Sequence, residues 1–405
     1  MSDNQEQQPA DIRPQLGLRQ VINVNGTMTY LGASVVVKKA RDAMAALLPQ
    51  FVEMDDLQRK ASAVIAEACG TEAGFITSSA ASGITVAVAG AMTGPDFAAI
   101  EQLPDTTGLK NEVVVMTGHM VHYGAPIEQG IRLSGAKVIQ VGQATFARRY
   151  QLDAAITERT ACAVYVVSHH AVQYGLMPLD EFSAVCHERG VPVIVDAASE
   201  YDLKKFIRDG ADIVLYSAQK FLGGPTAGIV AGHHQLIRDA YLQNSGIGRA
   251  MKVGKEGIIG AMAALQAWAK RDHLAVANKE MSYLQLWSNA LAGRPGISTD
   301  TVPDPTGNPL NRLRVKVNPE QARITAWDLA DALMRGDKPV SVRDHEVEHG
   351  WFFLDPCNLH PGQEHEVAQR LIEELEIALQ SPTVIATSLE RRRNRKFEAL
   401  LRWPG

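Results

Sequence analysis

Lys220 is the residue whose surroundings point most directly to chemistry. It follows the apolar, β-branched run 213–216, which predicts a buried strand, and it precedes the turn 223–226, Gly-Gly-Pro-Thr. A lysine in a desolvated pocket loses its proton more readily and becomes a nucleophile toward an aldehyde. The glycines let the backbone pass close to a bound group, and Ser217 and Thr226 could offer hydroxyls to a phosphate. The alternative is a surface lysine on a loop, which the strand and the turn disfavour.

Asp196 ends another apolar run, Val193-Ile-Val-Asp. Ligands collect at the carboxyl ends of strands in open α/β sheets, and a carboxylate there needs a cationic partner or hydrogen bonds. An aspartate in this position could equally bind Mg²⁺ or a ribose, or cap a helix. Taken alone, Asp196 therefore predicts a ligand site without naming the ligand.

Residues 78–83, Ser-Ser-Ala-Ala-Ser-Gly, lead a predicted strand at 73–79 into a small-residue helix that begins at Ala80. The free N–H groups of a helix start, together with the helix dipole, make an anion site, to which Ser78 and Ser79 would add hydroxyls. The alternative is an ordinary serine N-cap.

These three features together match the needs of pyridoxal phosphate (PLP). That cofactor requires a phosphate cup, a carboxylate near its pyridine nitrogen and a lysine that forms a Schiff base. The sequence offers the cup at 78–83, with Ser78, Ser79 and Ala80 as its first residues, the acid at Asp196 and the lysine at Lys220. We therefore predict PLP as the cofactor.

The elements that must position these residues alternate between strand and helix. The strands are short and apolar throughout, which indicates burial on both faces of a mostly parallel sheet covered by helices, and hence an α/β fold. The predicted strands are 113–116, 138–141, 163–167, 193–196, 213–216 and 228–231, and the predicted helices among them are 178–189 and 201–209.

The order of elements changes toward the C-terminus. A helix is predicted at 46–69, a loop at 94–111 and one long helix at 256–293; the strands 313–317, 339–342 and 351–354 and the helices 326–334 and 364–379 follow. This later pattern indicates a smaller α+β domain. We expect an N-terminal arm and segment at 1–45, a large PLP-binding domain at 46–293 and a small domain at 294–405.

Composition excludes several classes of protein. The chain has 405 residues, of which 46% are hydrophobic and 21% charged, and a net charge of -5, which gives no reason to expect a nucleic-acid or membrane partner. The first twenty residues lack the apolar core of a secretory signal. Four cysteines without CxxC spacing make a disulfide framework or a zinc site unexpected, so we predict no metal and a cytoplasmic protein.

The order and spacing of the motifs resemble the fold type I PLP enzymes over nearly the whole chain. Within them the chain is similar to the selenocysteine-synthase-like branch and, more narrowly, to the D-glucosaminate-6-phosphate ammonia lyases. The motifs that carry this resemblance are residues 21–29, 167–175, 210–217, 224–228 and 247–256. The resemblance implies an aspartate-aminotransferase-like sheet of the seven-stranded type sandwiched by helices, and a homodimer or larger homo-oligomer.

The resemblance also implies roles near the cofactor. His119 or His122 would stack on the pyridine ring, with His119 preferred because it is nearer the strand end. Ser168, His169 and His170 end the next strand, where one of them would hydrogen-bond the cofactor's phenolic oxygen or act as an acid for a leaving hydroxyl. For each histidine the alternative is a structural role.

Five basic residues are implied to bind substrate. Arg249, Lys252 and Lys255 would hold a phosphate or a carboxylate, unless they are simply a solvated helix face. Arg343 is the first choice for the substrate α-carboxylate and Arg314 the second, because a guanidinium binds both carboxylate oxygens at once. The branch often reads Asp-Pro-Arg where this chain has Asp355-Pro-Cys, so the substrate here could differ.

We predict a PLP-dependent lyase that removes the α-proton and the β-hydroxyl of a 2-amino-3-hydroxy acid, giving a 2-keto acid and ammonia. An amino sugar acid such as D-glucosaminate or its 6-phosphate is the favoured substrate. The alternatives are racemisation, aldol cleavage or β-replacement with the same cofactor. A non-catalytic tRNA- or PLP-binding protein is the second alternative. The basic run 391–396 would suit RNA, although a C-terminal helix with a charged face explains it as well.

Overall fold

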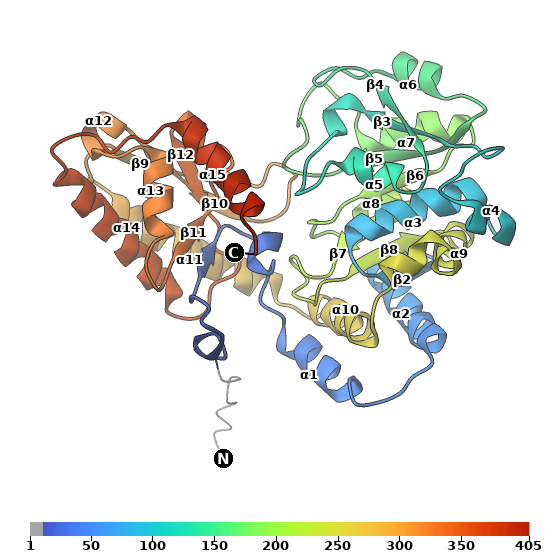
Figure 1. The fold of residues 1–405 in the computed structure, drawn as a ribbon, viewed down its shortest axis with the longest axis horizontal. Coiled ribbons are helices and arrows are strands. Elements are labelled where there is room, and N and C mark those ends of the chain that lie inside the picture. The colour runs from blue at the N-terminus through green and yellow to red at the C-terminus, as the bar shows by residue number, and fades with distance from the viewer. Residues whose placement is uncertain (1–10, 405) are drawn as a thin grey trace. The chain divides into compact units, whose positions relative to one another are not determined.

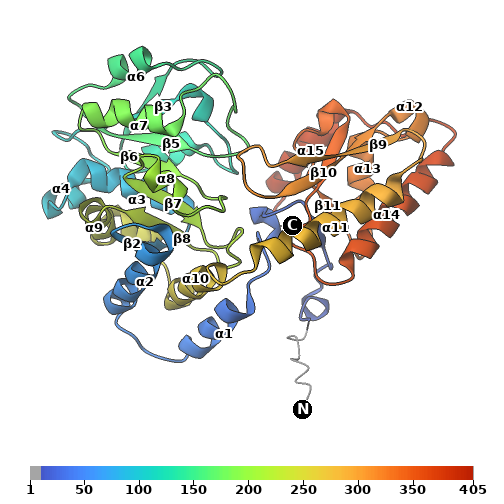
Figure 2. The same ribbon diagram turned by 180° about the vertical axis from the view of Figure 1, so that it is seen from behind.

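The computed structural model describes residues 11–404, the side chain of residue 396 excepted. The described chain forms two compact units. The large unit comprises residues 27–272 together with 304–309, and the small unit comprises residues up to 26, 273–303 and 310 onward. Figures 1 and 2 show the elements of each unit from opposite sides.

The large unit is built on a seven-stranded sheet in the order β2-β8-β7-β6-β5-β3-β4. Its strands are β2 (Ala73–Thr77), β3 (Glu112–Met116), β4 (Lys137–Val141), β5 (Thr160–Val166), β6 (Val193–Asp196), β7 (Ile213–Ser217) and β8 (Gly228–Gly232). Strands β3 to β7 pair with one another in parallel, and β8 runs antiparallel to both of its neighbours, β7 and β2. The predicted α/β class with a mostly parallel sheet is confirmed.

Helices cover both faces of this sheet, because its central strands are buried throughout. One face packs on α3 (Ala80–Thr93), α5 (Ile127–Arg132) and α9 (His234–Leu242). The other packs on α1 (Lys38–Leu47), α2 (Met54–Cys69), α6 (Arg149–Ala155), α7 (Leu179–Glu188), α8 (Lys205–Arg208) and α10 (Lys255–Trp268). The short helix α4 (Phe97–Gln102) follows α3, capped by the Asp96 carboxylate.

The small unit has a three-stranded antiparallel sheet in the order β12-β10-β9 and a parallel pair β1-β11. Its strands are β1 (Ile22–Val24), β9 (Ile297–Pro303), β10 (Asn311–Val317), β11 (Val340–Val342) and β12 (Trp351–Leu354). Its helices are α11 (His273–Leu291), α12 (Pro319–Ala322), α13 (Ala326–Leu333), α14 (Gln363–Leu379) and α15 (Leu389–Leu401). The core between them is centred on large buried side chains such as Trp287 and Phe352.

Several predicted elements differ from the structure. The expected helix 256–293 is two helices, α10 and α11, and the expected loop 94–111 contains α4. The expected helix 201–209 is reduced to α8, and the expected helix 46–69 begins only at Met54. The motif 21–29 contributes a strand, β1, to the small unit. The break between α10 and α11 falls where no glycine or proline marks a boundary, and β1 pairs with a strand that is distant in sequence.

Candidate active site

Several predicted site residues of the large unit gather at the carboxyl-terminal end of the parallel strands of the sheet. In the register of the sheet, Gly228 at the start of β8 pairs with Thr77 at the end of β2 and with Ser217 at the end of β7. Asp196 ends the neighbouring strand β6, where it pairs with Leu215. The carboxyl ends of the parallel strands therefore lie beside the Thr226–Gly228 segment, as ligand sites of open α/β sheets require.

The serines after β2 form a hydroxyl cluster at the start of α3. Ser79 is the N-cap, and its Oγ accepts the backbone N–H of Ser82 at 3.1 Å. The Ser82 Oγ lies 2.7 Å from both the Ser78 Oγ and the Ser79 Oγ. The capping alternative is thus realised, but the first N–H groups of the helix, beginning with Ala80, have no acceptor within the helix. The serine cap therefore leaves helix N–H groups that could bind an anion, and the prediction of an anion site stays open.

Backbone packing brings this cluster close to β8. A Cβ on Gly228 would stand 2.2 Å from the carbonyl oxygen of Ser79, a distance no side chain tolerates. Close packing of β8 against the Ser79 backbone therefore requires a glycine at position 228.

Lys220 lies in a tight turn between β7 and β8. The turn is closed by Gly223 N–H donating to the Lys220 carbonyl (3.0 Å) and Gly224 N–H donating to the Ala218 carbonyl (2.7 Å). Gly223 has a φ of +64°, in the left-handed region that favours glycine. The Lys220 side chain is half-buried, so the turn gives it a fixed origin and a partly desolvated setting.

Asp196 is buried within electrostatic reach of Lys220. Its carboxylate is 7% exposed and accepts the backbone N–H of Ala198 at 3.3 Å. Burial raises the pKa of Asp196, and the positive charge of Lys220 opposes that rise. A buried carboxyl with this environment gains from a cation placed against it.

His119 and His122 differ sharply in their surroundings. His119, in the 3-10 helix Thr117–His119, is buried; its Nδ1 accepts the Val166 N–H at 3.1 Å and its ring meets the Tyr165 ring edge-on at 4.4 Å. Burial lowers the pKa of His119 to about 4, so the ring is neutral at physiological pH. His122 is exposed, and its Nδ1 accepts the Gly124 N–H. His119 is therefore the one that adjoins the strand ends.

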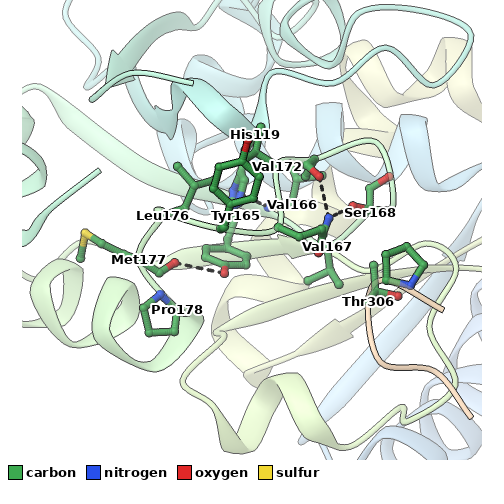
Figure 3. A pocket seen from close by; sticks show the side chains of 14 residues that line it. His119, Tyr165, Val166, Val167, Ser168, Val172, Leu176, Met177, Pro178 and Thr306 are labelled. Carbon is green, nitrogen blue, oxygen red and sulfur yellow. Dashed lines mark hydrogen bonds between the residues drawn. The ribbon is translucent and has the colours of Figure 1, made fainter. Parts of the chain in front are cut away.

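A cavity of about 270 Å³ opens beside His119 at the end of β5 (Figure 3). Its walls include Tyr165, Ser168, Gln173 and Thr306, whereas Lys220 and Asp196 are not among them. Ser168 also accepts the backbone N–H of His170 with its Oγ, and the rings of His169 and His170 lie 3.8 Å apart between centroids. The cavity thus lies beside the carboxyl end of β5, and neither Lys220 nor Asp196 lines it.

Glu200 is a buried acid that the sequence did not single out. It is 7% exposed, and its Oε1 lies 3.0 Å from the hydroxyl of Thr306. Burial raises the pKa of Glu200 to about 8; the Thr306 hydrogen bond opposes this, the charge of Asp304 adds to it, and the charge of Lys220 opposes it. Its partners lie more than a hundred residues away in the chain, and no local pattern announces such a contact.

The basic residues after the lysine turn are on the surface of the large unit. Arg249 and Lys252 are exposed, while the half-buried Lys255 donates to the Gln50 carbonyl and lies over the Phe51 ring. Lys255 is therefore committed to a structural contact, and the two exposed residues are consistent with either of their readings.

The two arginines of the small unit have unlike settings. Arg343 is 6% exposed, and its positive charge helps to keep the pKa of the buried Asp355 low, next to the larger effect of Arg312. Arg314 is bound to Asp300 through two hydrogen bonds (3.1 and 2.5 Å) and lies over the Trp351 ring. Cys357, at the unusual position of the Asp-Pro-Cys motif, donates its backbone N–H to Asp355.

The basic run on α15 is largely paired within the small unit. Arg392 binds Asp331 and Asp344, and Arg393 binds Glu348. These contacts support the interpretation as a charged helix face. Within residues 11–404, no helix is long and apolar enough to cross a membrane, and that part of the chain has no cluster of metal-binding side chains.

Comparison with known proteins decides the family. The profile of the family "SelA: L-seryl-tRNA selenium transferase" matches residues 21–294, more than half of the chain. The chain belongs to the L-seryl-tRNA selenium transferase family. Members of this family are fold type I PLP enzymes, so the family itself implies PLP.

Relatives within the L-seryl-tRNA selenium transferase family carry different names. A D-glucosaminate-6-phosphate ammonia lyase of Salmonella typhimurium is 38% identical over 363 residues, covering 90% of this chain and 97% of the relative. A 5'-C-glycyluridine monooxygenase-decarboxylase of Streptomyces is 37% identical, covering 88% and 90%. The L-seryl-tRNA(Sec) selenium transferase of Moorella thermoacetica is 24% identical, covering 89% and 83%.

Solved structures agree with the family fold. The structure of D-glucosaminate-6-phosphate ammonia-lyase matches with a TM-score of 0.84 at 38% identity, covering 92% of this chain and all of that one. The aspartate aminotransferase of Thermus thermophilus matches with a TM-score of 0.53 at 12% identity, covering 89% and 93%, and so supports the fold alone.

Proposed function

We propose that this member of the L-seryl-tRNA selenium transferase family is a PLP-dependent ammonia lyase. Its substrate would be a 2-amino-3-hydroxy acid, with D-glucosaminate or its 6-phosphate favoured, and its products a 2-keto acid and ammonia. The observation that carries the proposal is the convergence of Lys220 and the buried Asp196 at one sheet edge, in a chain 38% identical over 90% of its length to an ammonia lyase.

The residues at this edge fit PLP by the chemistry of their donors. The hydroxyls of Ser78 and Ser79 and the N–H groups at Ala80 suit a phosphate, with Ser217 and Thr226 as further hydroxyl donors. Asp196 suits a protonated ring nitrogen, because its buried carboxyl gains from a cation. When bound, PLP supplies an aldehyde that bonds amines and a ring that withdraws electrons from the α-carbon.

Lys220 performs the proton transfers in this proposal. Its Nζ would hold the cofactor, and the same amine would take the proton from the substrate α-carbon. Asp196 keeps the ring nitrogen protonated, and the neutral His119 is suited to lie against the ring without adding a charge. His122 is the second choice for that position.

The remaining residues bind substrate or assist the leaving hydroxyl. His169, half-buried, is the first candidate to donate a proton to the β-oxygen, with the exposed His170 second. Ser168 would hydrogen-bond the phenolic oxygen of the cofactor. Loss of water followed by its addition balances the reaction, because the amino nitrogen leaves as ammonia and the β-carbon gains a hydrogen.

Substrate anions would be held by the basic residues. Arg343 would bind the α-carboxylate, and Arg249 and Lys252 would bind a phosphate or carboxylate further along the substrate. Arg314 is the weaker candidate, because Asp300 already binds the edge of its guanidinium formed by Nε and Nη2. The proposal includes a homo-oligomer, which the mass of the purified protein in solution would test.

The test is to assay ammonia and 2-keto acid release with a panel containing D-glucosaminate, its 6-phosphate, serine and threonine. We expect release from one of the hydroxylated amino acids, and its loss in Lys220→Ala together with the visible absorbance of the bound cofactor. Lys110→Ala, at an exposed site, is the matched control. Turnover and cofactor absorbance that persist in Lys220→Ala would contradict the proposal.

A second function is favoured by the Streptomyces relative, since its identity of 37% nearly equals that of the ammonia lyase. An oxygen-dependent decarboxylation on the same scaffold would consume O₂ and release CO₂. The same panel, assayed under air and under nitrogen, distinguishes the two: ammonia-lyase turnover does not depend on O₂. Salt-sensitive binding of tRNA would instead favour the selenium-transferase reaction.

A further inference from the structure

Glu200 lies on the loop between β6 and α8, against the segment that carries Lys220. Two contacts join these segments. The Ser217 N–H donates to the Ala198 carbonyl at 3.1 Å, and the Tyr201 ring packs on the Phe221 ring at 4.5 Å between centroids. The neighbours of Glu200 and of Lys220 in the chain thus contact each other.

The hydroxyl of Thr306 lies between two buried carboxyl groups. Its Oγ1 is 2.6 Å from an oxygen of Asp304 and 3.0 and 3.3 Å from the two oxygens of Glu200. A hydroxyl has one proton to donate, so it cannot donate to both carboxyl groups at once. One of the two acids must therefore bring its own proton to the contact.

The other donors favour Asp304 as the ionised partner. The same Asp304 oxygen accepts the Thr306 N–H at 3.1 Å and the Asn308 amide at 3.2 Å. Asn308 also donates to the Thr306 Oγ1 at 3.0 Å. With several donors converging on Asp304, the hydroxyl proton points to Asp304, and Glu200 is left to donate to Thr306.

We propose that Glu200 is a neutral carboxylic acid in the folded protein, held so by its burial and by the negative charge of Asp304 across the Thr306 hydroxyl, and that its neutrality leaves Lys220 free to give up its own proton. This inference rests on the proposed function in one respect only, namely that Lys220 acts as a base. An ionised Glu200 would be a second carboxylate acting on Lys220 beside Asp196 and would hold its ammonium form. Glu200 is thus a positioning residue for the proton of Lys220.

The charged groups around Glu200 are consistent with this role. The charges of Asp304 and Lys220 act on Glu200 with opposite effects, and the hydrogen bonds of Thr306 and Asn308 act in the same direction as Lys220. Glu200 and Asp202 in turn act on the buried Tyr216. The burial that raises the pKa of Glu200 to about 8 keeps the neutral form through physiological pH.

The first test is infrared spectroscopy of the full-length protein at neutral pH. We expect the carbonyl band of a protonated carboxylic acid in the wild type, its loss in Glu200→Gln and its loss as the pH is raised well above 8. Glu158→Gln, at an exposed position, should keep the band. In Asp304→Asn the band should disappear at a lower pH, because a neighbouring negative charge is removed.

The second test measures Lys220 itself. Labelling by an amine-reactive reagent is quantified by mass spectrometry in the full-length protein without cofactor. Lys220 should be labelled equally fast in Glu200→Gln and wild type near pH 7, where Glu200 is neutral, and about ten-fold faster in Glu200→Gln near pH 9, where Glu200 of the wild type is ionised. Lys110 serves as the internal control. Infrared bands that do not change in Glu200→Gln, or a ratio of the two Lys220 labelling rates that is the same near pH 7 and near pH 9, would overturn the inference. Neither measurement needs substrate, so both can be interpreted even if the lyase assay detects no activity.

Discussion

The ring of Tyr201 packs on the ring of Phe221, and Tyr201 also meets Trp268 edge-on at 4.9 Å between centroids. This aromatic contact fixes the loop after β6 against the turn after β7. Asp196 and Glu200 lie on the first segment and Lys220 on the second, so the positions of two acids relative to the lysine depend on packing as well as on the sheet. The following predictions concern residues on these two segments or at the ends of the sheet strands.

Asp196→Asn should lower turnover by roughly 100-fold or more, because an amide cannot hold the proton on the ring nitrogen as a carboxylate does. The measurement is the rate of ammonia release at saturating substrate, with cofactor content determined on the same sample. Asp180→Asn, on the exposed start of α7, should leave the rate unchanged. A variant with full cofactor and wild-type turnover would show that Asp196 has no such role.

His119 should weaken the fold as the medium becomes acidic. Its folded pKa of about 4 lies below the ordinary value of 6.5, so between these values the unfolded chain binds the proton and the folded chain does not. Stability therefore falls as the pH drops from about 6.5 to about 4, by up to ~1.4 kcal/mol per pH unit. Denaturant unfolding at several pH values measures this slope.

In His119→Leu that part of the slope should vanish, although the variant should be less stable near pH 7 by about 1–3 kcal/mol, since the Val166 N–H loses its acceptor. His365→Gln, at an exposed position, should keep the wild-type slope. An unchanged acid slope in His119→Leu would mean that His119 is not the group responsible.

The contribution of Glu200 to the pH dependence of stability should be opposite in sign to that of His119. Its folded pKa of about 8 lies above the ordinary 4.5, so stability is greatest below about pH 4.5 and is lost as the pH rises toward 8. The stability of Glu200→Gln relative to wild type should therefore rise across this window, by up to ~1.4 kcal/mol per pH unit, and level off above it. Glu158→Gln should show no such trend, and a flat difference for Glu200→Gln would argue against a buried neutral acid.

Gly228→Ala should disturb the phosphate end of the site. Its Cβ would stand 2.2 Å from the Ser79 carbonyl oxygen, and the backbone must move to relieve this, at a cost of about 1–3 kcal/mol. We expect lower thermal stability and weaker PLP retention on dialysis. Gly257→Ala is the matched control, since its Cβ would meet only the movable Val253 side chain. Equal PLP retention in both variants would show that Gly228 is not needed for cofactor binding.

The sequence predicted most of the sheet because strand signals are local. The run Val193–Asp196 is a strand with those bounds, and the turn around Lys220 follows β7 as expected. The break between α10 and α11 was missed because residues 269–272 include neither glycine nor proline, so the apolar spacing continues across it.

The acid at Glu200 was missed for a different reason. Nothing near it in sequence distinguishes it from a solvated glutamate, and its burial depends on Thr306, 106 positions later. The same holds for Asp304 and Asn308, which look like turn residues until the loop 304–309 is seen to belong to the large unit. Local patterns predict elements and strand ends, whereas buried polar partners depend on tertiary packing.

The antiparallel course of β8 has a consequence for the order in which the protein can be made. Strand β2 is an edge strand that pairs with β8 alone, about 150 residues further along the chain. As the polypeptide leaves the ribosome, β2 and the serines that follow it must wait until residue 232 has emerged before they join the sheet. The apolar β2 is therefore exposed for much of synthesis, and chaperone dependence or premature aggregation should be concentrated in chains that end before β8.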